Sequence, residues 1–370
     1  MSNSIRDYLF NKLFFPKVVT IDKPGIIYTV YDRKFGRPAA KRRIIYFFED
    51  ILVNLQLETV KVLGKERTSE LWYKIGKEVG IGYLLQANIK KVPSFLLRSI
   101  IDYIFSSFRS AGMSVAEEIN FCSEESSLVL KGRENMVCRK SKIPNFSEGI
   151  VSGIFGSIVG KNTEAEAICN ECPYKCKIIT NPKIKKEFTY RYKKLKLPEQ
   201  YNKINFPQEM DLPKNIKSLS DLLNFKKISL DKLEKFCFKK QTILPCEAVL
   251  IDIAVTNYQE INKLELFKKS IVDGAKKIAE VILKDKYSIK EKIGALTSML
   301  GGFGWGIPYF KRGRNKIYFE FLYPPYSISG YLYQAFVVNG YLNHIFDKKL
   351  ELYDIKVKIK PYTISMIYGI

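Results

Sequence analysis

The chain contains the same order of apolar blocks twice, and this repetition constrains its fold more than any other feature of its sequence. The stretch from Leu52 to Gly76 can be laid without gaps on the stretch from Leu250 to Gly274. Two further blocks recur in the same order, residues 111–130 with 302–321 and residues 152–168 with 339–355. Ordered recurrence at similar spacing is typical of a duplicated structural unit.

Within each copy the apolar pattern predicts helices, a hairpin, another helix and a closing strand. Leu97, Ile101, Ile104 and Phe108 follow helical spacing, and Ser288 with Glu291 resembles a capping box ahead of the next copy's helix. Residues 126–130 and 316–323 read as strands, and the polar stretches before them read as hairpin turns. We therefore predict an α/β fold of the α+β type, with an antiparallel sheet packed with helices in each repeat. The two repeats are expected to form an internal pseudo-dimer.

The length of 370 residues favours two domains over one continuous core. We place the first domain at residues 1–180 and the second at residues 221–370. The intervening residues 181–220 are rich in Pro, Lys and Asn and read as a basic linker.

The composition gives a strongly positive chain. Sixty-one Lys and Arg against 38 Asp and Glu produce a formal charge of +23, which suits nucleic acid, an anionic membrane surface or an acidic protein as partner. A lysine-rich proteome would give the same composition without any such partner. No stretch is apolar for the roughly 18 to 20 residues of a spanning helix, and the first residues lack a signal-peptide pattern. We expect a cytoplasmic protein, and a homodimer is compatible with the sequence.

Three cysteines lie close together in the segment that ends the first copy. Cys169, Cys172 and Cys176 supply a C-x-x-C turn and a third thiol, and Cys122 or Cys138 could supply a fourth ligand. Four thiolates suit zinc in tetrahedral geometry. A redox pair of Cys169 with Cys172 and simple packing of the thiols as small hydrophobic groups are the alternatives.

The segment from Gly149 to Cys176 resembles the closing pattern of the vinyl-4-reductase domain. Gly149 and Gly153 match its helix glycines, Glu166 its acidic residue, and Cys169 and Cys176 its two cysteines. The resemblance implies two tandem copies, the second degenerate, since Cys169 falls on Lys356 there. It also implies a small α/β fold, akin to haem-nitric-oxide sensors and TRAPP transport subunits, that binds hydrocarbons or other small molecules.

Aromatic residues are dense on the expected helices. Most of them fit a hydrophobic core, while some could line an apolar cleft between helix and sheet. The candidate pocket residues are Trp72, Tyr73, Tyr83, Phe108 and Phe155. The chain has a single histidine, His344, and lacks a nucleophile-elbow motif, so it offers few residues that could form the catalytic triad of a hydrolase. The sequence therefore predicts an apolar-ligand-binding or sensing protein, not an enzyme, and no nicotinamide or flavin fingerprint is present.

Two basic segments also contain aromatic residues, a combination that suits phosphate contacts with base stacking. A scaffold that binds nucleic acid or another anionic partner is therefore the alternative function, and solvated loops are the simpler explanation. The candidate anion-binding residues are Lys185, Lys186, Arg191, Lys193, Lys194, Arg312 and Arg314.

Overall fold

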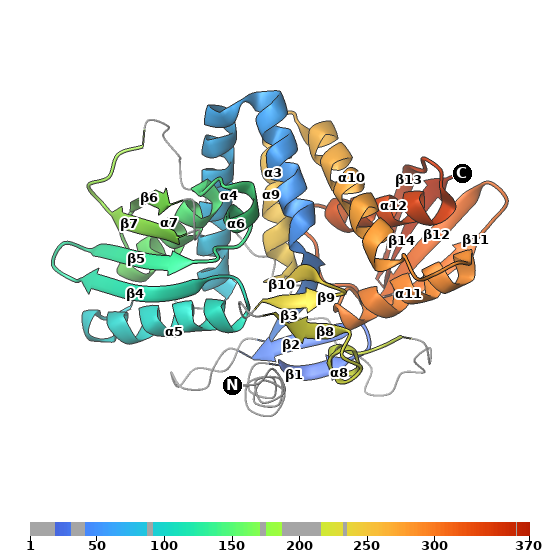
Figure 1. The fold of residues 1–370 in the computed structure, drawn as a ribbon, viewed down its shortest axis with the longest axis horizontal. Coiled ribbons are helices and arrows are strands. Elements are labelled where there is room, and N and C mark those ends of the chain that lie inside the picture. Colours follow the sequence, from blue (N-terminus) through green and yellow to red (C-terminus); the bar gives the residue numbers. More distant parts are fainter. Residues whose placement is uncertain are drawn as a thin grey trace. The chain divides into compact units, whose positions relative to one another are not determined.

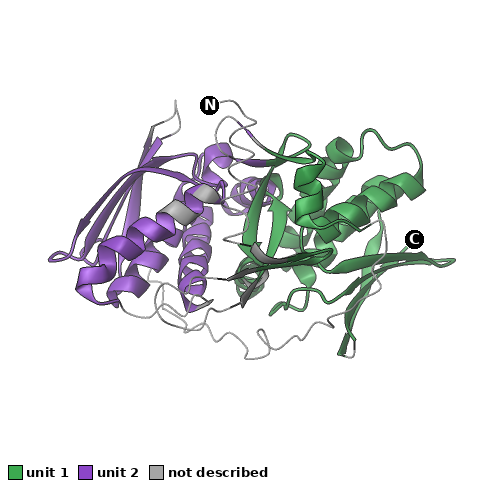
Figure 2. Cartoon of the chain, turned by 90° about the horizontal axis from the view of Figure 1, so that it is seen from below, with its two compact units in different colours: residues 1–51, 198–230, 237–370 green, residues 52–197, 231–236 purple. Residues whose placement is uncertain are grey.

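The structure is a computed structural model that describes residues 19–30, 41–86, 92–170, 175–186, 216–231, 235–359 and 361–370. Contacts divide the chain into two compact units (Figures 1 and 2). Unit 1 comprises residues 1–51, 198–230 and 237–370, and unit 2 comprises residues 52–197 and 231–236. Both units are discontinuous in sequence. The domain boundaries placed at residues 180 and 220 stay a prediction.

Unit 2 is a four-stranded antiparallel sheet with helices packed on it. The strands follow the order β4-β5-β7-β6, and helix α7 lies between the sheet and helix α4. The strands are β4 (Val115–Cys122), β5 (Ser127–Arg133), β6 (Glu164–Asn170) and β7 (Lys175–Asn181). The helices are α3 (Glu49–Leu63), α4 (Lys65–Gln86), the 3₁₀ turn η3 (Ser94–Leu96), α5 (Leu97–Ser110), α6 (Cys138–Ser141) and α7 (Asn145–Val159).

Unit 1 contains two sheets. A six-stranded sheet has the order β1-β2-β3-β10-β9-β8, and a four-stranded sheet has the order β11-β12-β14-β13. The strands of the first are β1 (Val19–Lys23), β2 (Ile26–Val30), β3 (Lys41–Phe48), β8 (Ile228–Leu230), β9 (Phe236–Phe238) and β10 (Gln241–Glu247). Those of the second are β11 (Ile307–Arg312), β12 (Lys316–Leu322), β13 (Glu351–Ile359) and β14 (Tyr362–Gly369). The helices are α8 (Leu219–Asn224), α9 (Ala248–Glu260), α10 (Leu264–Ile282), α11 (Ile289–Gly302) and α12 (Leu332–Phe346).

These elements confirm the predicted α+β fold. In both units two helices, a third helix, a hairpin, a helix and a second hairpin follow one another, and the two four-stranded sheets share one strand order. Helices α7 and α12 begin 187 residues apart, at Asn145 and Leu332, and strands β6 and β13 begin at the same interval. The internal pseudo-dimer and the assignment of both copies to one domain family stay predictions.

Local signals account for several of these elements. Ser288 and Glu291 form the capping box that begins α11, as the spacing predicts. Helix α5 buries Ile101, Ile104 and Phe108 on one face. Helix α7, by contrast, is apolar almost all round and buries nearly its whole length, because α4 covers one side of it and the sheet the other. No helix in the described residues is long and apolar enough to cross a membrane.

Two features of the predicted pattern were wrong. Each closing segment is a hairpin of two strands and not one strand, because β6 pairs antiparallel with β7 and β13 pairs antiparallel with β14. The polar stretch before residues 126–130, read as a hairpin turn, includes the first strand of the hairpin, β4. Its acidic side chains made it look like a loop, yet Glu117 and Glu118 pair across the sheet with Arg133 and Lys131.

Candidate functional site

The crossing of α4 and α7 in unit 2 depends on glycine. Gly76 and Gly80 on α4 lie against the backbone of α7, and Gly149 and Gly153 on α7 lie against the backbone of α4. A Cβ atom at any of these four positions would overlap with a main-chain atom of the other helix. The two helices therefore approach closely, and this approach brings side chains of α4 to the start of strand β6.

A buried polar cluster forms where α4 meets β6. The Tyr73 hydroxyl donates to Glu164 Oε2 at 2.5 Å and accepts the N–H of Ala165 at 2.9 Å. Lys77 Nζ forms an ion pair with Glu164 Oε1 at 2.7 Å and donates to the carbonyl oxygen of Thr163 at 3.0 Å. Burial lowers the pKa of Lys77, and the carboxylate of Glu164 opposes this shift. The polar groups of the cluster satisfy one another, so it fixes α4 to β6 and leaves no free group for a ligand.

Glu148, on α7, binds the middle of strand β6. Its Oε1 accepts the N–H of Ala167 at 2.8 Å, and its Oε2 lies 3.5 Å from Lys186 Nζ and 3.2 Å from Asn145 Nδ2. Burial raises the pKa of Glu148, while the positive charge of Lys186 and these hydrogen bonds work in the opposite direction. The side chain thus holds an edge strand of the sheet against α7.

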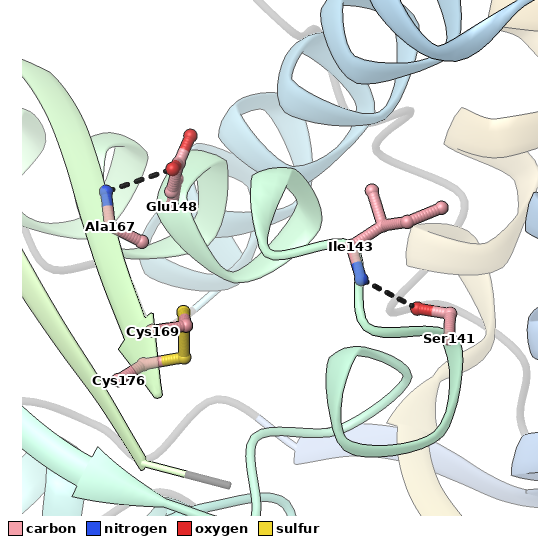
Figure 3. Close-up of a disulfide and its surroundings, with 6 residues drawn as sticks. All are labelled: Ser141, Ile143, Glu148, Ala167, Cys169 and Cys176. Atoms are coloured by element: carbon pink, nitrogen blue, oxygen red, sulfur yellow. Dashed lines mark hydrogen bonds between the residues drawn. A yellow bond between two sulfur atoms is a disulfide. The ribbon is translucent and has the colours of Figure 1, made fainter. Parts of the chain in front are cut away.

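A disulfide joins Cys169 on β6 to Cys176 on β7 (Figure 3). The two residues are direct partners in the antiparallel register, with their Cα atoms 4.1 Å apart. Cys176 is buried, on the sheet face that packs against α7, and Cys169 is half-buried. Ala167, whose N–H binds Glu148, and Cys169 are two residues apart on β6. The disulfide is therefore adjacent to the contact with Glu148 along the same strand, as Figure 3 shows.

The predicted zinc ligands are placed as follows. Cys138 is fully buried at the start of α6, and Cys122 is half-buried at the end of β4. Cys172 lies outside the described residues. Among the residues that the structure describes, no three His, Cys, Asp or Glu side chains are grouped so that they could hold a metal ion. The disulfide uses the sulfur atoms of Cys169 and Cys176, so a zinc site that includes them requires reduction and stays a prediction.

The predicted pocket residues are all buried, but they make different contacts. Tyr83 and Phe108 meet edge to face, with ring centroids 5.4 Å apart. Phe155 packs on Phe121 of β4, with centroids 5.9 Å apart. Tyr73 belongs to the polar cluster. Tyr83 and Phe108 of the set thus contact each other, and the pocket as a whole stays a prediction.

Trp72 differs from the rest of the predicted set. Its side chain is 1% exposed and packs edge to face on Phe146, with ring centroids 5.4 Å apart. Its Nε1–H finds no hydrogen-bond acceptor among the described residues. The other tryptophan, Trp305 in unit 1, is as deeply buried, yet its Nε1 donates to the carbonyl oxygen of Tyr46 at 2.7 Å. Buried indole N–H groups normally have such a partner.

The predicted anion-binding residues fall into two groups. Lys186 is engaged with Glu148 and lies 5.0 Å from the centroid of the Tyr73 ring, and Lys185 is exposed. Arg191, Lys193 and Lys194 lie outside the described residues. Arg312 is the last residue of β11, and Arg314 lies in the turn that follows.

Lys77, Glu148 and Glu164 were not among the site residues predicted from the sequence. The sequence does contain a pattern that could have indicated two of them: Lys77 and Glu148 are charged residues beside glycines in helices that otherwise bury apolar residues. A charged side chain at such a position requires a partner, but the sequence does not say which one.

No family model matches this chain. No curated protein matches it in sequence either. Among solved structures, the phenol-responsive sensory domain of the transcription activator PoxR with phenol is similar at 17% identity and a TM-score of 0.34, over 49% of this chain and 92% of that chain. A likeness at this level establishes neither a common fold nor a common function.

Proposed function

We propose that unit 2 is a sensing domain that binds a small, largely apolar molecule with one hydrogen-bond acceptor beside Trp72. The observation that supports the proposal is the buried Nε1–H of Trp72, which has no acceptor among the described residues. A buried donor without an acceptor costs about 1–3 kcal/mol, and a ligand oxygen placed beside the indole would remove this cost.

The surroundings of Trp72 restrict the class of ligand. Its ring packs on Phe146, so the adjoining part of the ligand must be apolar. Lys77, on the same helix as Trp72, is already paired with Glu164, so this pair offers no counter-ion for a charged ligand. The expected ligand is therefore uncharged, with an aromatic or short aliphatic body and one carbonyl, ether or hydroxyl oxygen.

The two tryptophans allow a direct test by NMR. The protein with ¹⁵N-labelled indole should give one cross-peak for Trp72 and one for Trp305, assigned with the variants Trp72→Phe and Trp305→Phe. Acetophenone and ethylbenzene are suitable probes, because they are similar in size and only the first has a carbonyl acceptor. We expect acetophenone to move the Trp72 cross-peak and to bind about tenfold more tightly than ethylbenzene.

The variants supply the control. Trp72→Phe keeps most of the buried ring, so it should fold and should lose the preference for acetophenone. Trp305→Phe should leave that preference unchanged. If neither probe binds, or if Trp72→Phe retains the preference, Trp72 is not part of a ligand site and the proposal is wrong.

A second function, thiol–disulfide switching, is favoured by the bond between Cys169 and Cys176. Reduction by an external dithiol would convert the disulfide to two thiols and oxidise the dithiol to its own disulfide. The disulfide joins β6 to β7, and Glu148 on α7 holds β6. The redox state of the disulfide would therefore change how firmly β6 is held against α7.

A further inference from the structure

The turn between β11 and β12 in unit 1 gathers four cations. Lys311, Arg312 and Arg314 are exposed, and Lys316 is half-buried. No acidic residue occurs between Tyr309 and Phe319. Within the described part of the chain none of the four cations takes part in an ion pair, so their charge is not neutralised locally.

Two of these cations lie over aromatic rings. The guanidinium of Arg312 is 5.4 Å from the centroid of the Phe346 ring, and Lys316 Nζ is 4.1 Å from that of Tyr353. Tyr353 is 70% exposed in spite of this contact. An exposed ring is therefore set directly beside an uncompensated cation.

A β-bulge presents Tyr353. The register between β13 and β14 shifts between Leu352 and Asp354, so Tyr353 has no partner on β14. A bulge of this kind redirects a side chain relative to the regular pleat. The corresponding strands of unit 2, β6 and β7, pair without a shift. The exposed tyrosine is thus a local feature of unit 1 and not a consequence of the strand order that both sheets share.

The turn itself is held in place. The N–H of Gly313 donates to the carbonyl oxygen of Lys316 at 2.8 Å, and the N–H of Ile370 donates to that of Asn315 at 3.1 Å. The backbone that carries the cations is therefore ordered before any partner binds, which lowers the entropic cost of association.

The equivalent turn in unit 2 carries the opposite charge. Between β4 and β5 the chain has Glu124 and Glu125, at the place in the strand order where unit 1 has Arg314. General lysine enrichment of the chain does not explain this difference, because it would act on both turns. Near the cationic turn of unit 1, Glu351 lies 3.9 Å from Lys349, so its charge is already engaged.

We propose that the β11–β12 turn and Tyr353 form a binding surface for single-stranded nucleic acid. The four cations contact successive phosphates, and an unpaired base stacks on the ring of Tyr353. A single strand fits better than a duplex, because bases in a duplex already stack on one another and offer no free face to an exposed ring.

Fluorescence anisotropy with a labelled oligothymidylate of about 16 nucleotides tests the proposal, at salt concentrations from about 50 to about 200 mM. The double variant Arg312→Gln, Arg314→Gln should bind about tenfold more weakly. It should also reduce the slope of log affinity against log salt by about 1.4, or about 0.7 for each phosphate that the variant no longer neutralises. Tyr353→Ala should weaken binding about fivefold or more, and Tyr353→Phe should restore it to within about twofold, since phenylalanine keeps the stacking face.

A matched control separates the surface from net charge. Lys284→Gln with Lys290→Gln removes the same charge from two exposed positions elsewhere in unit 1 and should leave affinity within about twofold of wild type. Equal loss in both double variants would show that only the overall charge matters and would overturn the proposal. A duplex bound as tightly as the single strand would overturn it too. So would binding to phosphatidylserine–phosphatidylcholine vesicles without binding to the oligonucleotide, since the surface would then contact membranes.

Discussion

Ser152 on α7 donates its hydroxyl to the carbonyl oxygen of Thr163, the residue before strand β6, at 2.6 Å. Unit 1 has the same contact 187 residues later, where Asn339 on α12 donates to the carbonyl oxygen of Leu350 at 2.9 Å. Ser152 and Asn339 are both buried, and each connects the central helix of its unit to the hairpin that follows. A serine in one half of the chain and an asparagine in the other thus form equivalent hydrogen bonds.

Replacing either donor should destabilise its own unit. We expect Ser152→Ala and Asn339→Ala each to lower the free energy of unfolding by about 1–2 kcal/mol, because each substitution removes a buried hydrogen bond to a main-chain carbonyl. Urea denaturation measures this. Ser157→Ala is the control, since among the described residues the half-buried hydroxyl of Ser157 bonds only to Gly153 within its own helix. This variant should change stability by less than about 0.5 kcal/mol. Equal effects of Ser152→Ala and Ser157→Ala would contradict this role.

The crossing of α4 and α7 gives a second prediction. Gly153→Ala places a methyl group against the carbonyl of Lys77 and should destabilise the protein by about 3 kcal/mol or more, because the two helix backbones must separate. Gly294→Ala provides the matched comparison, since nothing lies within 4 Å of its Cβ position in helix α11. There the substitution should stabilise the protein by about 0.5–1 kcal/mol. The unfolding temperatures of both variants would test this contrast. A shift of both temperatures in the same direction would contradict the prediction.

Much of the fold could be predicted from local sequence. Helix α5 follows from the spacing of Leu97, Ile101 and Ile104, and the start of α11 follows from Ser288 and Glu291. These signals are local, because a helix repeats every few residues and its cap lies within one turn.

Strand β4 and the closing hairpins could not be predicted in the same way, because their evidence is long-range. The acidic side chain of Glu117 looks like a loop residue until Arg133 is placed opposite it. The site has the same difficulty. Lys77 and Glu164 are 87 residues apart, and only the crossing of α4 over α7 brings them together. The cysteine spacing alone fits a zinc site or a redox pair, and only the register of β6 and β7 sets Cys169 opposite Cys176.

Asp252 on α9 predicts a dependence of stability on pH. Its buried carboxylate accepts the N–H of Ile328 at 2.7 Å and the hydroxyl of Ser329 at 2.6 Å. Burial raises the pKa of Asp252 to about 6, although these hydrogen bonds act in the opposite direction. Between about pH 4 and 6 the folded protein therefore binds more protons than the unfolded chain, so stability contributed by this group falls as pH rises through that window.

The variant Asp252→Asn removes this titration. Between pH 4 and pH 7 the free energy of unfolding of wild type should fall by roughly 2 to 3 kcal/mol relative to that of Asp252→Asn. Urea denaturation of both proteins at each pH measures this difference. Asp285→Asn alters an exposed carboxylate and should leave the pH profile of wild type unchanged. Parallel profiles for wild type and Asp252→Asn would show that the carboxyl of Asp252 titrates normally.

The disulfide between Cys169 and Cys176 predicts the number of reactive thiols. Of the seven cysteines, five should be alkylated in the denatured protein without reductant and all seven after reduction, as read by intact mass. The double variant Cys169→Ser, Cys176→Ser should lower stability by about 2 kcal/mol, because the bond closes a short loop in the unfolded chain, while reduction should not affect the variant further. Seven thiols without reductant, together with one equivalent of zinc lost in the variant, would contradict the disulfide. That outcome would make the cluster the metal site that its spacing also allows, because zinc binds thiolates and not a disulfide.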